Sequence, residues 1–137
     1  MMRCVLALVV AMLVAGEASA QSLTEERARR RVERTLGDQI SFTNSVCETE
    51  IALGVVWGDI EIAGREGAAV SACDAALSAV ETVCRSEDRN KVRREIVRYR
   101  CELPGAGLDL SGGTFAYGVE PGEGDYYAVL QFLRARL

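Results

Sequence analysis

Two cysteines on one predicted helix limit most strongly how this chain can fold. In residues 68–85 the apolar side chains recur with the 3.6-residue period of an α-helix, and Cys73 and Cys84 fall on the same apolar stripe. Eleven residues of helix separate their Cα atoms by ~16 Å, whereas a disulfide needs about 4.4–6.8 Å. The two cysteines therefore do not pair with each other. The polar residues of this segment, including Asp74 and Glu81, lie on the opposite arc, which we expect to face solvent.

The start of the chain has the features of an export signal. Arg3 provides a positive charge, residues 5–16 form an apolar run, and Ala18-Ser19-Ala20 is a small-x-small cleavage site. The apolar run is shorter than the ~20 residues that span a bilayer. We therefore expect a signal peptide at 1–20, which is removed, and one mature domain at 21–137 without a membrane span. Such a protein resides in the periplasm or outside the cell.

Four cysteines remain in the predicted mature chain, and an even number in an exported protein indicates two disulfides. Each helical cysteine then pairs with Cys47 or Cys101, which leaves two connectivities open. The strand after the helix runs back along it, so Cys101 comes to lie nearer Cys73 than Cys84. This direction favours a bond between Cys73 and Cys101. Cys47 would then pair with Cys84.

Hydrophobic periodicity predicts the other elements. Ser22 and Glu25 fit a capping box at the start of the first helix. The predicted elements are, in chain order, a solvated helix at 22–36 that stops at Gly37, a strand at 47–57, the helix at 68–85, a charged loop at 86–90, a strand at 91–103, a strand at 108–119 with a bulge or close backbone approach at Gly112 and Gly113, and a helix at 126–137 capped by Asp125. A strand at 126–133 stays open as an alternative for the last segment.

This order of elements predicts an α+β domain. The strands at 91–103 and 108–119 are joined by a short link, so we expect them to form an antiparallel hairpin. A small antiparallel sheet would then pack against the central, disulfide-linked helix in two layers around one core.

Several catalytic chemistries are excluded by composition. The sequence contains no histidine, which excludes Ser-His-Asp and Cys-His catalysis and histidine metal ligation. Oxidised cysteines leave no thiolate. Lys91, the one lysine, directly follows a charged loop, and this position does not suit a Schiff base. Glu120, Glu123 and Asp125 lack the spacing of an EF-hand loop and fit a polar turn before a helix. We expect no cofactor, and the net charge of −4 gives no attraction to nucleic acid.

Carboxylates are the remaining catalytic candidates. Glu48 and Glu50 share one face of a predicted strand, and Asp59 and Glu61 share a face if their segment is extended. Glycoside hydrolases use two carboxyl groups on either side of a sugar cleft. A small hydrolase acting on cell-wall glycan is therefore an alternative function, although a solvated strand face explains the same residues.

Aromatic side chains provide the other candidate site. Trp57 ends a predicted strand, where ordinary core packing is the alternative role. Tyr126 and Tyr127 are adjacent, so only one of them can point into the core from a helix. An exposed aromatic side chain would suit a protein or glycan partner in the cell envelope. We therefore take Trp57, Tyr126 and Tyr127 as the candidate partner surface.

Several structural features occur together in this chain: the export signal, the segment 42–47 that ends in Cys47, the helix with Cys73 and Cys84, the strand ending at Cys101, and the Gly-Thr-Phe sequence at 113–115. Together they resemble small exported four-cysteine bacterial proteins of uncharacterised function. The resemblance implies a periplasmic location and carries no active-site residues. We expect a non-enzymatic, disulfide-stabilised binding or accessory protein, for example an inhibitor. The carboxylate-pair hydrolase and a structural envelope protein without a ligand are the alternatives.

Overall fold

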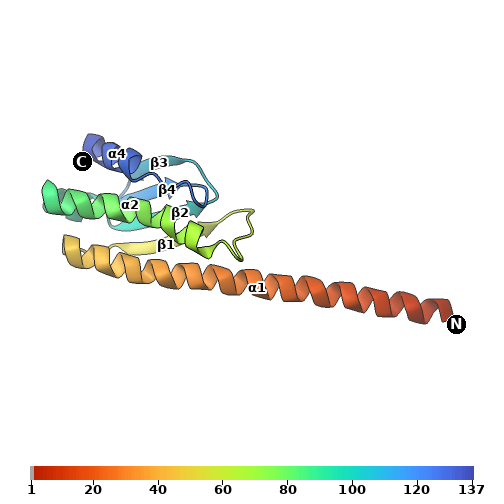
Figure 1. Cartoon of the computed structure of the whole chain (residues 1–137). Coiled ribbons are helices and arrows are strands. Elements are labelled where there is room, and N and C mark those ends of the chain that lie inside the picture. The colour runs from red at the N-terminus through yellow and green to blue at the C-terminus, as the bar shows by residue number, and fades with distance from the viewer. Residues whose placement is uncertain (1) are drawn as a thin grey trace.

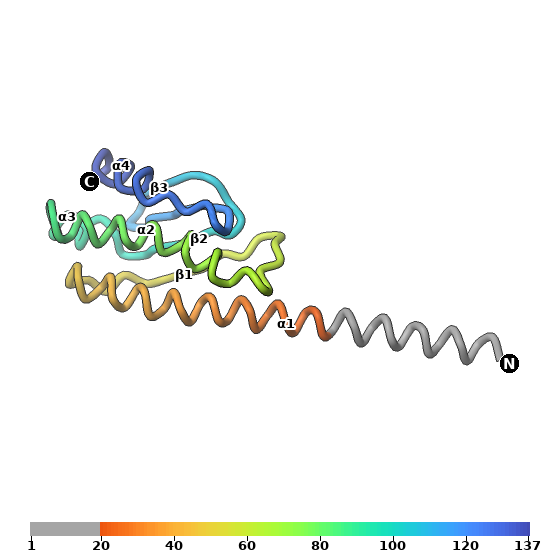
Figure 2. Tube along the Cα trace, in the orientation of Figure 1, coloured from red at the N-terminus to blue at the C-terminus, as the bar shows by residue number. Residues whose placement is uncertain are grey.

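The computed structural model describes residues 20–137, so the predicted signal peptide lies outside the described residues except for Ala20 (Figure 2). The described part of helix α1 begins at Ala20. The elements are, in chain order, α1 (Met2–Cys47), β1 (Ala52–Trp57), α2 (Glu66–Ser86), α3 (Arg89–Glu95), β2 (Arg98–Leu103), β3 (Gly107–Ser111), β4 (Thr114–Gly118) and α4 (Tyr126–Arg136).

The elements form two layers, which confirms the predicted α+β class. One layer is a four-stranded sheet in the order β1-β2-β4-β3, and the other contains α1, α2 and α4, with α2 between its two neighbours (Figure 1). Helix α2 is long and apolar enough to cross a membrane by length and composition, but most of its apolar side chains are buried in this core. The buried Tyr99 hydroxyl donates to the carbonyl of Cys73 on α2 at 2.7 Å, and its ring lies 5.5 Å from the ring of Phe115, which stacks on Phe132 of α4.

The sheet is mixed, which corrects the prediction of an antiparallel sheet. Strand β2 pairs in parallel with both β1 and β4, and only β3 and β4 are antiparallel. The predicted hairpin between 91–103 and 108–119 is therefore wrong. The hairpin forms instead within 108–119, where Gly112 and Gly113 adopt φ angles of 57° and 81°. A two-residue turn of this kind needs positive φ at both positions, which glycine supplies without strain.

Helix α1 passes through Gly37 and ends at Cys47, so the prediction that it stops at Gly37 is wrong. Its continuation places buried residues on one stripe along the helix, namely Ala28, Val32, Leu36, Ile40, Thr43 and Cys47. Burying this stripe against α2 outweighs the ~1 kcal/mol that a glycine costs inside a helix. Because α1 continues to Cys47, the strand predicted at 47–57 begins later, and β1 spans only Ala52–Trp57.

The remaining differences are local. Residues 89–95 form the short helix α3, capped by Asp88, so the predicted strand at 91–103 is shortened to β2. Helix α4 confirms the helix predicted at 126–137. Its cap is Asp125, as expected.

Two disulfides fasten α2 to its neighbours. Cys47–Cys84 joins the end of α1 to α2 and Cys73–Cys101 joins α2 to β2, with Cα–Cα distances of 5.3 and 5.8 Å. These are the pairs that the direction of the strand favoured. Disulfides persist in oxidising compartments, so the two bonds suggest an oxidising, exported environment.

Candidate functional site

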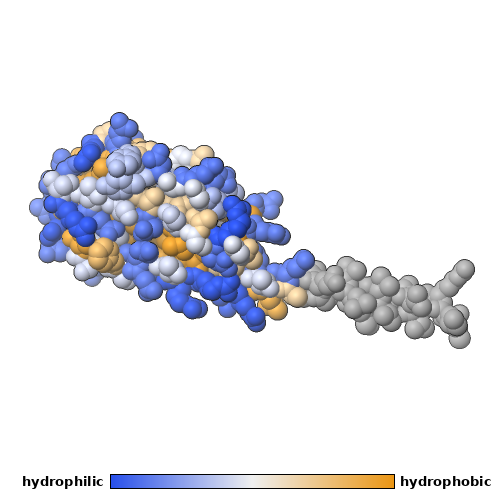
Figure 3. Space-filling model, viewed as in Figure 1, coloured by the Kyte–Doolittle hydropathy of each residue, from blue (hydrophilic) through white to orange (hydrophobic). Residues whose placement is uncertain are grey.

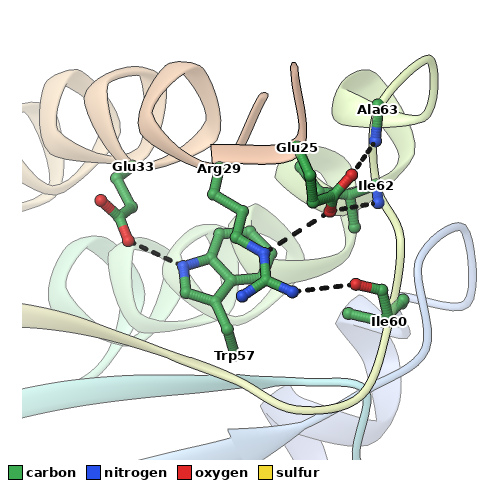
Figure 4. A network of polar contacts seen from close by, with 7 residues as sticks. All are labelled: Glu25, Arg29, Glu33, Trp57, Ile60, Ile62 and Ala63. Atoms are coloured by element: carbon green, nitrogen blue, oxygen red, sulfur yellow. Dashed lines mark hydrogen bonds and ion pairs between the residues drawn. The ribbon is translucent and has the colours of Figure 1, made fainter. Parts of the chain in front are cut away.

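Trp57 contacts helix α1 rather than standing free of the fold (Figure 4). Its indole N–H donates to the Glu33 carboxylate at 2.7 Å, and the Arg29 guanidinium lies 5.2 Å from the ring centroid. The same guanidinium donates to the carbonyl of Ile60 at 3.0 Å. Trp57 is half-buried and packs against the core, so it connects β1 to α1 and leaves only part of its ring for a partner.

Glu25 extends this network to the loop before α2. Its carboxylate accepts hydrogen bonds from the N–H groups of Ile62 and Ala63 at 2.7 and 3.0 Å, and Arg29 lies 3.5 Å away (Figure 4). Burial opposes the ionisation of Glu25, but these hydrogen bonds and Arg29 outweigh it and lower the pKa of the carboxyl. Glu25 therefore holds the loop against α1 instead of capping its own helix with Ser22.

The two tyrosines at the start of α4 point in different directions. The hydroxyl of Tyr126 lies 2.7 Å from the hydroxyl of Thr82 on α2, and its ring is half-buried. Tyr127 is 78 % exposed, and its ring meets Tyr126 edge-on with centroids 5.0 Å apart. Tyr126 therefore packs inward and Tyr127 outward, as their adjacency indicated.

A shallow hollow of about 270 Å³ lies beside Tyr127 on the outer side of α4 and is lined by Tyr127, Leu130, Gln131 and Arg134. Trp57 contacts α1 and this hollow belongs to α4, and these two helices pack on opposite sides of α2 (Figure 1). The structure therefore brings Tyr126 and Tyr127 together but does not join Trp57 to them.

The carboxylates considered for hydrolysis are divided between the two ends of β1. Glu48 and Glu50 precede the strand and line an open pocket of about 440 Å³, where Glu48 pairs with Arg89 at 3.2 Å. Asp59 and Glu61 follow the strand in an irregular segment and are exposed. The two pairs therefore do not face each other across one cleft.

The acidic turn before α4 has a structural role. Asp125 accepts a hydrogen bond from the N–H of Ala128 at 3.0 Å and so caps the helix. Within residues 20–137, no group of three or more Cys, Asp or Glu side chains is arranged to hold a metal ion.

A polar seam between α1 and α2 was missed by the sequence analysis. It consists of Thr35, Gln39 and Thr43 on α1 and Asp74, Ser78 and Glu81 on α2. Asp74 and Glu81 were expected to face solvent, but α1 covers this side of α2. Glu81 is only 8 % exposed, and its Oε2 accepts a hydrogen bond from the fully buried Thr43 hydroxyl at 3.2 Å.

Neither carboxylate of the seam has an ionic partner in the described part of the chain. Among the ion pairs of residues 20–137, none includes Asp74 or Glu81. Burial raises the pKa of Asp74, against a hydrogen bond from Ser78. Burial also raises the pKa of Glu81, and the charge of Asp74 adds to this, while Thr43 and Arg85 oppose it.

The spacing of the seam was visible in the sequence. Its α1 residues recur every fourth position and reach the buried stripe at Thr43, and its α2 residues recur at intervals of four and three. Residues at this spacing share one side of a helix. The sequence did not indicate that these two polar rows face each other, because it predicted that the first helix stops at Gly37.

The seam opens into a groove beside the first half of α2. This groove has a volume of about 500 Å³, and we call it the α1–α2 groove. An ion pair of 2.5 Å joins Arg31 to Glu66 on its lining. The groove is lined in addition by apolar side chains from Val32 and Val70 and by polar side chains from Thr35, Gln39, Ser71 and Asp74.

Comparisons with known proteins identify no relative. No protein-family model, curated protein or solved structure matches this chain. The resemblance to exported four-cysteine proteins therefore stays a prediction. On the face seen in Figure 3, hydrophobic side chains occur in small patches between hydrophilic ones. The outer side of α4 and the α1–α2 groove are the two candidate binding surfaces.

Proposed function

We propose that this chain is an exported, non-enzymatic accessory protein that binds a protein partner in the periplasm or outside the cell. The surface we assign to this role is the outer side of α4. An inhibitor of an envelope protein is one activity of this kind.

The exposure of Tyr127 is the observation that carries the proposal. A tyrosine ring that is 78 % exposed presents a large amphipathic surface to solvent. Arg134 lines the neighbouring hollow. Tyrosine and arginine are enriched at the centres of protein interfaces, where a few such residues supply most of the affinity. The hollow beside the ring offers space for a side chain of the partner.

The support beneath this surface is rigid. Tyr126 is fixed by its contact with Thr82 and packs edge-on against Tyr127. The inner side of α4 is buried against α2 through Val129 and Leu133. A surface that is already ordered loses less conformational entropy when it binds, which favours affinity.

Export is supported by two independent features. Residues 1–20 have the pattern of a signal peptide, and the four remaining cysteines form two disulfides. Fractionation of cells that produce the full chain, followed by N-terminal sequencing, tests this part. We expect a periplasmic or secreted product that begins at Gln21; a cytoplasmic product with residues 1–20 retained would contradict it.

Partner binding is tested by capture from an envelope fraction with three forms of the mature protein: wild type, Tyr127→Ala and Val97→Ala. Val97 is the matched control because it is an apolar residue, 61 % exposed, outside α4. We expect one protein to be retained by wild type and Val97→Ala and to be reduced about tenfold or more with Tyr127→Ala. Identical capture by all three forms would disprove the role of α4.

A second measurement separates protein from glycan. Wild type and Tyr127→Ala are sedimented with isolated cell-wall glycan, and the supernatant is assayed for released sugar. The proposal expects neither sedimentation nor release. Sedimentation that depends on Tyr127 would indicate a glycan-binding protein instead, and release of sugar would support the hydrolase.

A further inference from the structure

We propose that the α1–α2 groove binds an organic cation, an alkylammonium or guanidinium group, with Asp74 as its counter-ion. This site is separate from the surface on α4, because α1 and α4 pack on opposite sides of α2 (Figure 1). The proposal therefore goes beyond the partner binding described above and does not depend on it.

The groove has the size and lining for a small ligand with both apolar and polar parts. Its volume of about 500 Å³ lies within the range of about 300–1,000 Å³ that is typical of small-molecule sites. Val32 and Val70 offer apolar contact for methylene groups. The side chains of Thr35, Gln39 and Ser71 offer hydrogen bonds to the polar end of a ligand.

The charges on the groove leave one carboxylate without compensation. Arg31 from α1 and Glu66 from α2 pair with each other at 2.5 Å, so their charges largely cancel. Asp74 is then the one charged side chain on the groove's lining that has no ionic partner within the described residues. A cation in the groove would gain a charge-assisted hydrogen bond to Asp74, whereas an anion would be repelled.

The lining favours an organic cation over a metal ion. Calcium takes six to eight oxygen ligands, usually from several carboxylates and carbonyls. Asp74 and Glu66 are eight residues apart, which separates them by ~12 Å along the helix axis. They cannot chelate the same ion. A monovalent ammonium or guanidinium group needs only one carboxylate together with neutral hydrogen-bond acceptors.

The walls of the groove are fixed before any ligand arrives. The Cys47–Cys84 disulfide fastens α1 to α2 at one end, and the ion pair between Arg31 and Glu66 joins the helices at the groove itself. A preformed site avoids the entropic cost of ordering its walls. Burial raises the pKa of Asp74, so cation binding, which needs the ionised carboxylate, should strengthen as the pH rises.

The test is a titration of the oxidised mature protein with cadaverine, followed by NMR of labelled backbone and side-chain amides. We expect progressive shifts at the Gln39 side-chain amide and at Ser71, with a dissociation constant of about 1 mM or lower. Asp74→Asn should weaken binding about tenfold or more. Asp109→Asn, which removes an exposed carboxylate from β3, is the matched control and should bind as wild type.

Two further ligands define the chemistry. The diol 1,5-pentanediol has the length of cadaverine without its charge and should cause no shifts. N-acetyl-lysine amide presents the same ammonium group as a protein side chain does. Binding of this compound as tightly as cadaverine would indicate that the natural ligand is a lysine of a peptide, and weaker binding would indicate a free amine.

Three results would overturn the proposal: no shifts at about 10 mM cadaverine, equal weakening by Asp74→Asn and Asp109→Asn, or equal shifts with the diol. The folded state of each variant is checked by thermal unfolding, in which Asp74→Asn should be at least as stable as wild type because it removes a desolvated charge. Tyr127→Ala should leave the cadaverine titration unchanged, so failure of this proposal and failure of partner binding by α4 are distinguishable.

Discussion

Replacement of Glu81 by glutamine is expected to stabilise this protein at neutral pH. Glu81 is 8 % exposed, accepts a hydrogen bond from Thr43, and lacks an ionic partner within residues 20–137. Burial, with the nearby charge of Asp74, raises its pKa above the ordinary value of 4.5. Glutamine keeps an acceptor for the Thr43 hydroxyl and has no charge to desolvate.

The magnitude has two sources. An incompletely compensated polar group in a protein interior costs about 1–3 kcal/mol. Asp74 lies seven residues away, or ~10.5 Å along the helix, where the repulsion is about 0.4–1.6 kcal/mol for effective dielectric constants of about 80 to 20. Lost attraction to Arg85 offsets part of this gain. We expect a net stabilisation of about 1 kcal/mol, or about 3–5 °C in Tm for a domain of this size.

The pH dependence distinguishes this cause from others. A carboxyl whose pKa is raised in the folded state holds its proton more tightly when folded, so its contribution to stability is full below pH 4.5 and is lost as the pH rises through the folded pKa. Glu81→Gln has no carboxyl at this position, so its stability does not fall in this way as the pH rises. The free energies of unfolding of wild type and variant should therefore converge in acid and separate at neutral pH.

Urea unfolding between about pH 4 and about pH 8, followed by the fluorescence of Trp57, the single tryptophan, measures the effect. Glu95→Gln removes an exposed carboxylate and should stay within about 0.5 kcal/mol of wild type. A double-mutant cycle with Asp74→Asn isolates the repulsion between the two carboxylates. Lower stability of Glu81→Gln near pH 8, or a difference that does not change with pH, would refute the reasoning.

Three further variants test contacts of α1, α2 and β1. Replacing Cys47 and Cys84 by serine removes a bond across 37 residues and should lower the free energy of unfolding by about 2–4 kcal/mol; a loss below about 0.5 kcal/mol in urea would mean that other contacts hold α1. Gly124→Ala would place a Cβ 2.8 Å from a backbone atom of α2 and should cost about 1–3 kcal/mol, so an unchanged Tm would contradict the close approach. Arg29→Ala removes the cation 5.2 Å from the Trp57 ring, which should cost about 0.5–1 kcal/mol and shift the emission to longer wavelength; an unchanged spectrum would mean that Arg29 does not cover the ring.

Several features were predictable because they depend on neighbours along the chain. The apolar stripe of α2, the cap of α4 at Asp125 and the opposite orientations of Tyr126 and Tyr127 follow from helical periodicity and side-chain chemistry. The exclusion of a bond between Cys73 and Cys84 follows from the rise of a helix alone.

Other features depend on which elements meet, and only the tertiary structure decided them. Periodicity describes the sides of a single strand or helix, so it did not reveal that β2 pairs in parallel with β4 or that α1 passes through Gly37. The burial of Glu81 followed from that extra length of α1, because a polar row is solvated until another helix covers it. The sequence by itself therefore determined the α+β class, the central helix with its apolar stripe, the exclusion of a Cys73–Cys84 bond and the aromatic candidates. The tertiary structure decided between the two remaining disulfide connectivities. The contact between α1 and α2 determined the α1–α2 groove and its uncompensated charge.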